Sequence, residues 1–416
     1  MNKKIKIGLF ALIILGTITL CLTYKSDDKI IKTKKRKQNN LAIMIKEDGA
    51  TDYTKSNSKD IPKGDYVLNR DKSYCKNNGK IGNYDSSLGK VSFSFIGTDS
   101  CYLYFDYEVP SVNILGVKIP LDTELDSSGT SSTKYIVSNE NGYRYEGADP
   151  NNYICLDNKT GGACSNNSLL FRIIGLFDEE YSSNGTTSAG TKKLLKILDT
   201  NNYGGTSGKY WNDDETNNWS TASLKTELND PYLRTLLDTR GVNSKLNDAI
   251  VISKWHLGGA SSSNFATLTA EGIYTEERNT DAIYVYGSNP SSIYAKVGLM
   301  YPSDYGYATV GGSTTSKENC RAKELYNWYD ESYSDCKNND WLFTSQNSFA
   351  NGAEWLLSPF STTSRDAALL FGTGEVEIRP VASNQYAVRP TFYLDSSILK
   401  IVGSGDGTKD NAYRVG

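Results

Sequence analysis

Six of the seven cysteines lie in three pairs that are close together in the sequence, and this pattern limits the folds open to the chain. The pairs are Cys75 with Cys101, Cys155 with Cys164, and Cys320 with Cys336. An even number of cysteines in near-neighbour pairs predicts three local disulfides and an oxidising environment. No pair has the Cys-x-x-Cys spacing of zinc or thioredoxin-like sites, so we expect no metal there.

The N-terminus combines basic residues with an apolar segment. Lys3, Lys4 and Lys6 precede the uncharged residues 7–24, and a basic stretch follows. We interpret residues 1–40 as an uncleaved membrane-anchor helix and a basic stalk, with a cleaved signal peptide as the alternative. The positive-inside rule alone would place the remainder of the chain inside. The paired cysteines favour the opposite orientation, so we expect a single-pass cell-membrane protein whose bulk is extracellular.

Composition excludes several classes of function. The chain of 416 residues has a net charge of −3, so no overall basic field favours nucleic acid, and we expect no nucleic-acid partner. His256 is the single histidine, which excludes His pairs and His-rich zinc sites. Its neighbours Lys254-Trp255 and Leu257 favour a packed structural role. Tyrosine is abundant at 29 residues, as it is in adaptable recognition surfaces, although an ordinary loop-rich extracellular protein has the same composition.

Patterning divides the remainder of the chain into three parts. Residues 41–120 alternate polar and apolar positions and predict a small β-module held by one cysteine pair. Residues 121–142, rich in Asp, Ser, Thr and Gly, predict a linker, and 143–416 a larger α+β domain. Within that domain a helix is expected over 192–198. Two helical pieces are expected over 220–238, with Ser220 as N-cap, because leucines share a face there and Pro231 interrupts the run.

Carboxylates are the candidates for chemistry. Trp211-Asn212-Asp213 copies a tripeptide that supplies calcium ligands in sugar-binding C-type lectins, but calcium needs oxygens from several segments, so a solvated acidic loop is the favoured interpretation. Hydrolysis would need a carboxylate pair, for which Asp304, Glu318 and Glu324 are available, although their spacing cannot identify one. We expect these three to be solvated at the surface. No cofactor and no metal site are expected.

The C-terminal region predicts a hairpin beside a fixed apolar frame. Residues 366–371 and 375–379 have the lengths of two strands around a Gly-Thr-Gly turn, and the second strand alternates Val and Ile with charged residues. Trp355 and Phe392 are expected to be buried, and the charged face exposed. We weigh a binding surface equally against an ordinary solvated hairpin. The candidate ligand-binding residues are Arg365, Asp366, Phe371, Thr373, Glu375, Glu377, Arg379, Asn384, Gln385 and Tyr386.

Several short pieces occur in an order that resembles a known superfamily. The pieces are Asn152-Tyr153, Arg172-Ile173-Ile174-Gly175, Trp219-Ser220, Ser223-Leu224, Leu228-Asn229, the Trp-Leu-Leu-Ser-Pro run at 355–359, and Val388-Arg389-Pro390. Together they resemble bacterial surface domains related to formylglycine-generating enzymes, which implies a C-type-lectin-like fold over 143–416. The end of the chain is similar to variable proteins of diversity-generating retroelements. That similarity implies a hypermutated ligand-binding segment, corresponding to 361–386.

The resemblance implies a non-catalytic surface protein, an adhesin or receptor for an extracellular protein or glycan. The enzymes of the superfamily use redox-active cysteines near the C-terminal core, and here no cysteine follows Cys336. The Glu-Pro-Asn loop of calcium-dependent sugar binding is also missing. Two alternatives stay open, an enzyme of the formylglycine-generating superfamily and a structural cell-envelope protein without a dedicated site.

Overall fold

The computed structural model describes residues 39–107, 136–139 and 142–415, apart from gaps at 48–49, 64–65, 86–87, 96, 160–161, 240–241, 243–244, 262, 344–349, 397–400 and 402–404. The chain forms two compact units, Met1–Pro110 and Ser111–Gly416. The expected membrane anchor and most of the expected linker lie outside the described residues. Among the described helices, none has the length and apolar character needed to cross a membrane.

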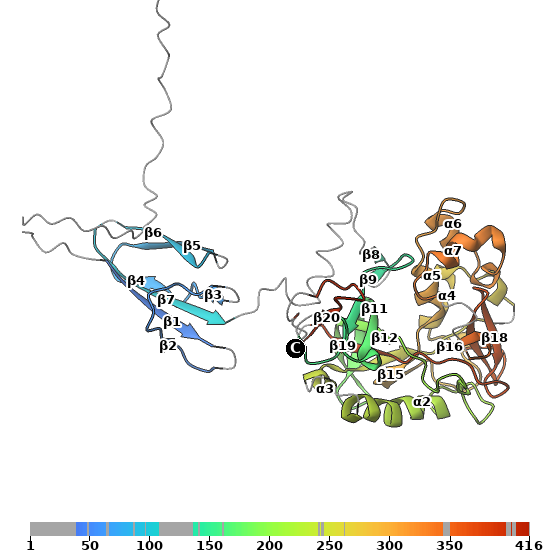
Figure 1. The fold of residues 1–416 in the computed structure, drawn as a ribbon. Coiled ribbons are helices and arrows are strands. Elements are labelled where there is room, and N and C mark those ends of the chain that lie inside the picture. Colours follow the sequence, from blue (N-terminus) through green and yellow to red (C-terminus); the bar gives the residue numbers. More distant parts are fainter. Residues whose placement is uncertain are drawn as a thin grey trace, which may run out of the picture. The chain divides into compact units, whose positions relative to one another are not determined.

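The first unit is built from β-strands alone in its described part (Figure 1). One sheet has the order β2-β1-β7-β3, with β4 also paired to β7, and β5 pairs with β6 in a second sheet. Strands β1 and β7 run parallel, while the other pairs are antiparallel. The strands are β1 (Asn40–Lys46), β2 (Thr54–Lys55), β3 (Tyr66–Leu68), β4 (Tyr74–Cys75), β5 (Lys80–Asp85), β6 (Lys90–Ser94) and β7 (Ser100–Tyr107).

Buried and partly exposed side chains alternate along β7, and the buried ones form much of the small core of this unit. Cys101, Leu103 and Phe105 are buried, whereas the tyrosines between them are partly exposed, as a strand with one face on a core requires. Only Ile43 and Leu68 join Leu103 and Phe105 as fully buried members of that apolar cluster in the described residues. The Cys75–Cys101 disulfide joins β4 to β7, with the two Cα atoms 4.0 Å apart. The disulfide therefore supports a core that is small for its unit.

The second unit is centred on a ten-stranded sheet with the order β14-β13-β11-β12-β19-β15. Strands β8, β9, β10 and β20 extend it beside β11. The strands are β8 (Ile136–Asn139), β9 (Gly142–Tyr145), β10 (Tyr153–Cys155), β11 (Leu170–Ser182), β12 (Ser188–Asp199), β13 (Ile252–His256), β14 (Ser292–Ala295), β15 (Val297–Gly298), β19 (Thr391–Asp395) and β20 (Tyr413–Arg414).

The long hairpin β11–β12 corrects one prediction. The helix expected over 192–198 does not form, because these residues belong to strand β12, which pairs with β11 on one side and β19 on the other. The apolar run Leu194-Leu195 and Ile197-Leu198 is completely buried, so both faces of the strand are covered. A strand covered on both faces has no polar alternation, and its pattern cannot be distinguished from a buried helix over so few residues.

Helices connect and cover the strands of this unit. The helices are α2 (Ser223–Glu227), α3 (Lys245–Ala249), α4 (Ala270–Arg278), α5 (Pro302–Tyr307), α6 (Lys317–Ala322) and α7 (Ser334–Asn338), with π-helical turns η3 (Leu228–Tyr232) and η4 (Thr235–Thr239). Short 3-10 turns are η2 (Asn167–Leu169), η5 (Phe265–Thr267), η6 (Ala282–Tyr284), η7 (Leu325–Asn327), η8 (Glu331–Tyr333) and η10 (Ala350–Gly352). The described chain is therefore mixed α+β with most regular structure in sheets, as predicted.

The prediction of helical structure over 220–238 is confirmed, but the expected division into two pieces is wrong, since residues 223–239 are helical without a break and Pro231 lies inside η3. The segment includes α2, η3 and η4, and all four of its predicted core leucines are buried, namely Leu224, Leu228, Leu233 and Leu236. Ser220 is not the N-cap. Ala222 occupies that position, and the Ser220 hydroxyl instead donates to Oδ1 of Asn218 at 2.7 Å. The regular helix ends early because Pro231 has no amide hydrogen to donate.

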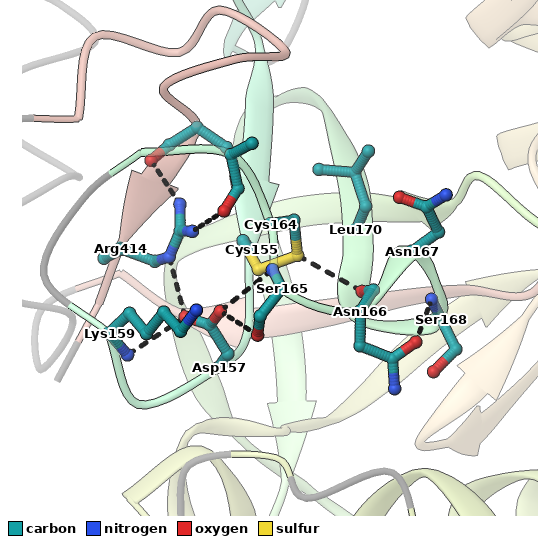
Figure 2. Close-up of a disulfide and its surroundings, with 12 residues drawn as sticks. Cys155, Asp157, Lys159, Cys164, Ser165, Asn166, Asn167, Ser168, Leu170 and Arg414 are labelled. Atoms are coloured by element: carbon teal, nitrogen blue, oxygen red, sulfur yellow. Dashed lines mark hydrogen bonds and ion pairs between the residues drawn. A yellow bond between two sulfur atoms is a disulfide. The ribbon is translucent and has the colours of Figure 1, made fainter.

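All three predicted disulfides are present. The Cα atoms of Cys155 and Cys164 are 5.7 Å apart, and those of Cys320 and Cys336 are 5.3 Å apart. The first of these bridges lies beside a buried ion pair in which Arg414 donates through Nε to Oδ1 of Asp157 at 2.7 Å (Figure 2). This ion pair and the parallel pairing of β20 with β10 fix the C-terminal strand to the disulfide loop.

Candidate functional site

A three-stranded antiparallel sheet carries the predicted binding surface. Its order is β16 (Ala353–Pro359), β17 (Asp366–Phe371) and β18 (Val376–Pro380), so the expected hairpin is present. Strand β16 is buried along its whole length, and helix α5 lies against both β16 and β17. The turn between β17 and β18 closes when the Phe371 amide donates to the Glu375 carbonyl at 2.9 Å.

Two tryptophan side chains connect this sheet to the neighbouring segment around 209–211. Trp355 and Phe392 are completely buried, which confirms that part of the prediction. The Trp355 indole donates to the Lys209 carbonyl at 2.8 Å, and the Trp211 indole donates to the Leu356 carbonyl at 3.1 Å. Both bonds join β16 to the segment around 209–211. The frame behind the hairpin is therefore fixed by directional bonds as well as by apolar packing.

The loop that enters β17 is organised by one buried amide. Nδ2 of Asn217 donates to the carbonyl groups of Phe360, Thr363 and Asp366 at 2.8, 2.9 and 2.9 Å. The Asn217 backbone amide adds a bond to the Ser364 carbonyl at 2.6 Å. These bonds leave Arg365 exposed at the outer edge of the loop. Asn217 therefore determines where the first candidate ligand-binding residue stands.

The ten predicted binding residues differ in exposure. Three are exposed, namely Arg365, Thr373 and Asn384. Six are partly buried, namely Asp366, Phe371, Glu375, Glu377, Arg379 and Gln385. The tenth, Tyr386, is only 5% exposed, so its place on the predicted binding surface is not supported.

Tyr386 is drawn into the core by its backbone. Its amide donates to the Lys209 carbonyl at 2.9 Å, and the Lys209 amide donates back at 2.8 Å. The ring then meets Trp355 edge to face, with centroids 5.1 Å apart. Tyr386 thus belongs to the frame, and its hydroxyl accepts a bond from Asn384 at 3.3 Å.

The charged face of β18 is less exposed than predicted. Val376 is fully buried as expected, but Ile378 and the three charged residues at 375, 377 and 379 are all partly buried. Arg379 forms an ion pair with Glu377, and its guanidinium lies 5.0 Å from the Phe371 ring centroid. Carboxylate oxygens usually find partners when buried, yet no described residue bonds to the buried Oε2 of Glu375. The surface therefore has aromatic, cationic and anionic groups in close contact.

A cluster of buried charges lies elsewhere in the unit. Asp304 is 2% exposed, which corrects the expectation that it is solvated. Its carboxylate accepts from Arg144 at 2.8 Å, from Lys196 at 2.5 Å and from the Tyr301 amide at 2.8 Å. Burial alone would raise the pKa of Asp304, but Lys196 and Arg144 outweigh it and hold the pKa at about 2. Asp304 is therefore an anion that neutralises two cations.

Further titratable groups surround this cluster. Glu277 is completely buried and accepts from the Ser303 amide at 3.0 Å, and burial raises its pKa to about 7 against the opposing charge of Arg278. His256 lies 3.8 Å from Glu179 through Nε2, and burial lowers the pKa of its imidazole. The histidine is packed as predicted. Glu318 is exposed and Glu324 partly exposed, so neither shares the buried site of Asp304.

The acidic loop is a solvated loop, as expected. Asp213, Asp214 and Glu215 are exposed, whereas the Asn212 side chain is engaged by the Ser223 amide at 3.1 Å and the Thr216 carbonyl at 2.7 Å. Among the described residues, the grouping with metal-ligand spacing is Cys155, Asp157 and Cys164. Its sulfurs form a disulfide and its carboxylate pairs with Arg414, so its donors are already used (Figure 2).

The sequence analysis did not identify Lys196 and Arg144 as buried cations paired with Asp304. A signal existed for the lysine, since it interrupts the apolar run at 194–198 and a charge inside a buried strand requires a partner. Nothing local identifies that partner, which lies 108 positions away.

Compared with known proteins, the sequence matches no family model, and neither a curated protein nor a solved structure was found to be similar.

Proposed function

We propose that the chain is a non-catalytic cell-surface protein that binds an extracellular protein or glycan through the β17–β18 hairpin and the loop after it. The observation that carries the proposal is the pairing of a fixed frame with a chemically mixed surface. The frame consists of Trp211, Asn217 and Trp355, whose side-chain N–H groups all donate to backbone carbonyls. A rigid support lowers the entropy cost of binding.

The groups above this frame are those that binding sites favour. Arg379 and Phe371 lie in contact, and aromatic and arginine residues dominate the energetics of protein interfaces. Arg365, Thr373 and Asn384 add exposed polar groups around them. We further propose that the large unit is a C-type-lectin-like scaffold and that residues 1–40 anchor it in the membrane. The three disulfides support an extracellular location for the bulk of the chain.

The proposal is tested by binding of the full chain to a combined glycan and protein array. Arg365→Ala with Arg379→Ala should abolish or strongly weaken the signals, while the melting temperature changes little. The matched control is Arg234→Ala, which removes a side chain that is 63% exposed outside the hairpin. Equal loss of binding in the control, or no loss in the double variant, would move the site away from the hairpin.

We also propose that residues 361–386 are the diversified segment. Buried positions within it, such as Leu369, Leu370 and Val376, cannot change freely because they form the core of the sheet. Sequencing the gene in many isolates should therefore find changes at the exposed and partly buried positions and apolar residues at the buried ones. Changes spread evenly along the whole gene would contradict the idea.

A further inference from the structure

A cavity of about 310 Å³ lies in the large unit and shares no residue with the hairpin surface. Distant segments meet there, including β10, β11, the end of β12 and the C-terminal region. Its volume is near the lower limit of ordinary ligand pockets, which suits one sugar ring better than an extended chain. The walls carry the side chains of Tyr153, Arg172, Asn201, Trp341, Arg389 and Lys409.

Arg172 is held in a fixed position at this cavity. It is the direct cross-strand partner of Tyr153, and its guanidinium lies 4.3 Å from that ring centroid and 4.5 Å from the Trp341 centroid. Nε donates to Oδ1 of Asn152 at 2.7 Å, and Nη2 donates to Asp149 at 3.1 Å. Among the described residues none accepts a bond from Nη1. The group is therefore positioned in advance and retains donor capacity.

The charges around the cavity do not cancel. Arg389 is neutralised by a two-bond contact with Glu354, at 2.8 Å for each bond. Within the described part of the chain, Arg172 forms an ion pair with Asp149 alone, whose carboxylate side chain is 75% exposed and screened by water. Lys409 is exposed and has no ion-pair partner in the described part of the chain. Burial lowers the pKa of Arg172 to about 10, and the nearby charge of Arg389 acts in the same direction. An anion would relieve this excess.

The remaining walls offer groups for hydroxyls. Asn201 donates through Nδ2 to the Asn167 carbonyl at 2.9 Å and to Asp199 at 3.0 Å. Its Oδ1 receives no bond from a described side chain, so it can accept one from a ligand. The aromatic rings of Trp341 and Tyr153 add apolar surface. We propose that this cavity binds the carboxylate-bearing ring of an acidic sugar, with the carboxylate between Arg172 and Lys409.

The inference does not depend on the hairpin binding anything, and the two can fail separately. The test titrates the full chain with sodium glucuronate, N-acetylneuraminate, glucose and inorganic phosphate, and records ligand NMR signals and heat. The two acidic sugars should bind saturably, and glucose should bind about tenfold more weakly or not at all, because it lacks the charge-assisted bond. Equal binding of glucose and glucuronate would overturn the assignment. Phosphate binding as strong as that of the sugars would do the same.

Substitutions of residues that line the cavity test whether the acidic sugar binds there. Lys409→Glu should weaken glucuronate binding about tenfold, since it replaces an attraction with a repulsion. Lys159→Glu is the matched control, because Lys159 is also exposed and does not line the cavity. Arg172→Lys keeps the charge but removes the planar fork and should also weaken binding. Unchanged affinity in Lys409→Glu and Arg172→Lys, with both variants folded, would overturn the proposal.

Discussion

At the scale of single residues, Asp304 is the counter-ion of two buried cations. It neutralises Arg144 and Lys196, and all three side chains are about 1% exposed. Asp304→Asn would leave both cations without their counter-ion. The free energy of unfolding should fall by about 3 to 5 kcal/mol in denaturant titrations.

The matched control is Asp178→Asn. Asp178 pairs with Lys193 at 3.0 Å, but both side chains are about half exposed, at 52% and 49%. Water screens such a pair, so the free energy of unfolding should change by less than about 1 kcal/mol. Losses of similar size at both positions would contradict the assignment of Asp304 as a buried counter-ion.

Glu277 should make the stability of the folded chain depend on pH. Its pKa is raised to about 7 in the folded state, so the folded chain binds the proton more tightly than the unfolded chain does. Stability from this group is present at low pH and is lost as the pH rises from about 4.5 through 7. Glu277→Gln should remove that part of the decline, which melting curves between pH 4.5 and 8 would reveal. An unchanged slope would show that folding does not raise the pKa of Glu277.

The two predicted buried aromatics contrast with Tyr386, which sequence patterns misplaced. Trp355 and Phe392 could be predicted because each stands in a continuous apolar segment. Tyr386 follows Ser383-Asn384-Gln385, which has the composition of a surface loop. Its burial depends on backbone pairing with Lys209, which is 177 positions earlier in the chain. Such a long-range bridge leaves no trace in the local pattern.

At the scale of elements, the loop before β17 depends on Asn217. Asn217→Ala removes the donors to three carbonyl groups, and the unfolding free energy should fall by about 1 to 3 kcal/mol. Hydrogen exchange should increase mainly at 360–366, and array binding should weaken because Arg365 loses its position. Asn384→Ala, which changes an exposed asparagine, should leave exchange in that loop unaltered. Uniform exchange changes across the unit would contradict this local role.

The elements also show the limits of sequence patterns. The leucines in 220–238 were correctly predicted to be buried, and Leu224, Leu228, Leu233 and Leu236 all are. The regular 3.6-residue repeat is not kept, because Leu228 and Leu236 lie in π-helical turns. The prediction failed for β12, whose apolar run at 194–198 is covered on both faces. A buried strand and a short buried helix have the same composition, and the flanking strands decide between them.

At the scale of the whole molecule, two units with separate cores should unfold separately. The Cys75–Cys101 disulfide joins residues 26 positions apart in the first unit, whose described apolar core has four fully buried members. Replacing both cysteines with alanine should lower the stability of that unit by about 2 to 4 kcal/mol. Calorimetry should then show one transition shifted downward and the transition of the second unit unmoved. A shift of both transitions would show that the units unfold together.

The most direct test of the account is a scan of single substitutions across 361–386, with binding to the glycan and protein array and the melting temperature measured for each variant. Substitutions at Arg365, Thr373 and Asn384 should change binding while altering stability by only about 0.5 kcal/mol. Substitutions of Leu369 or Val376 by alanine should cost about 2 to 5 kcal/mol, since these side chains are completely buried. If the exposed positions left all binding unchanged, the hairpin would not be the ligand-binding surface.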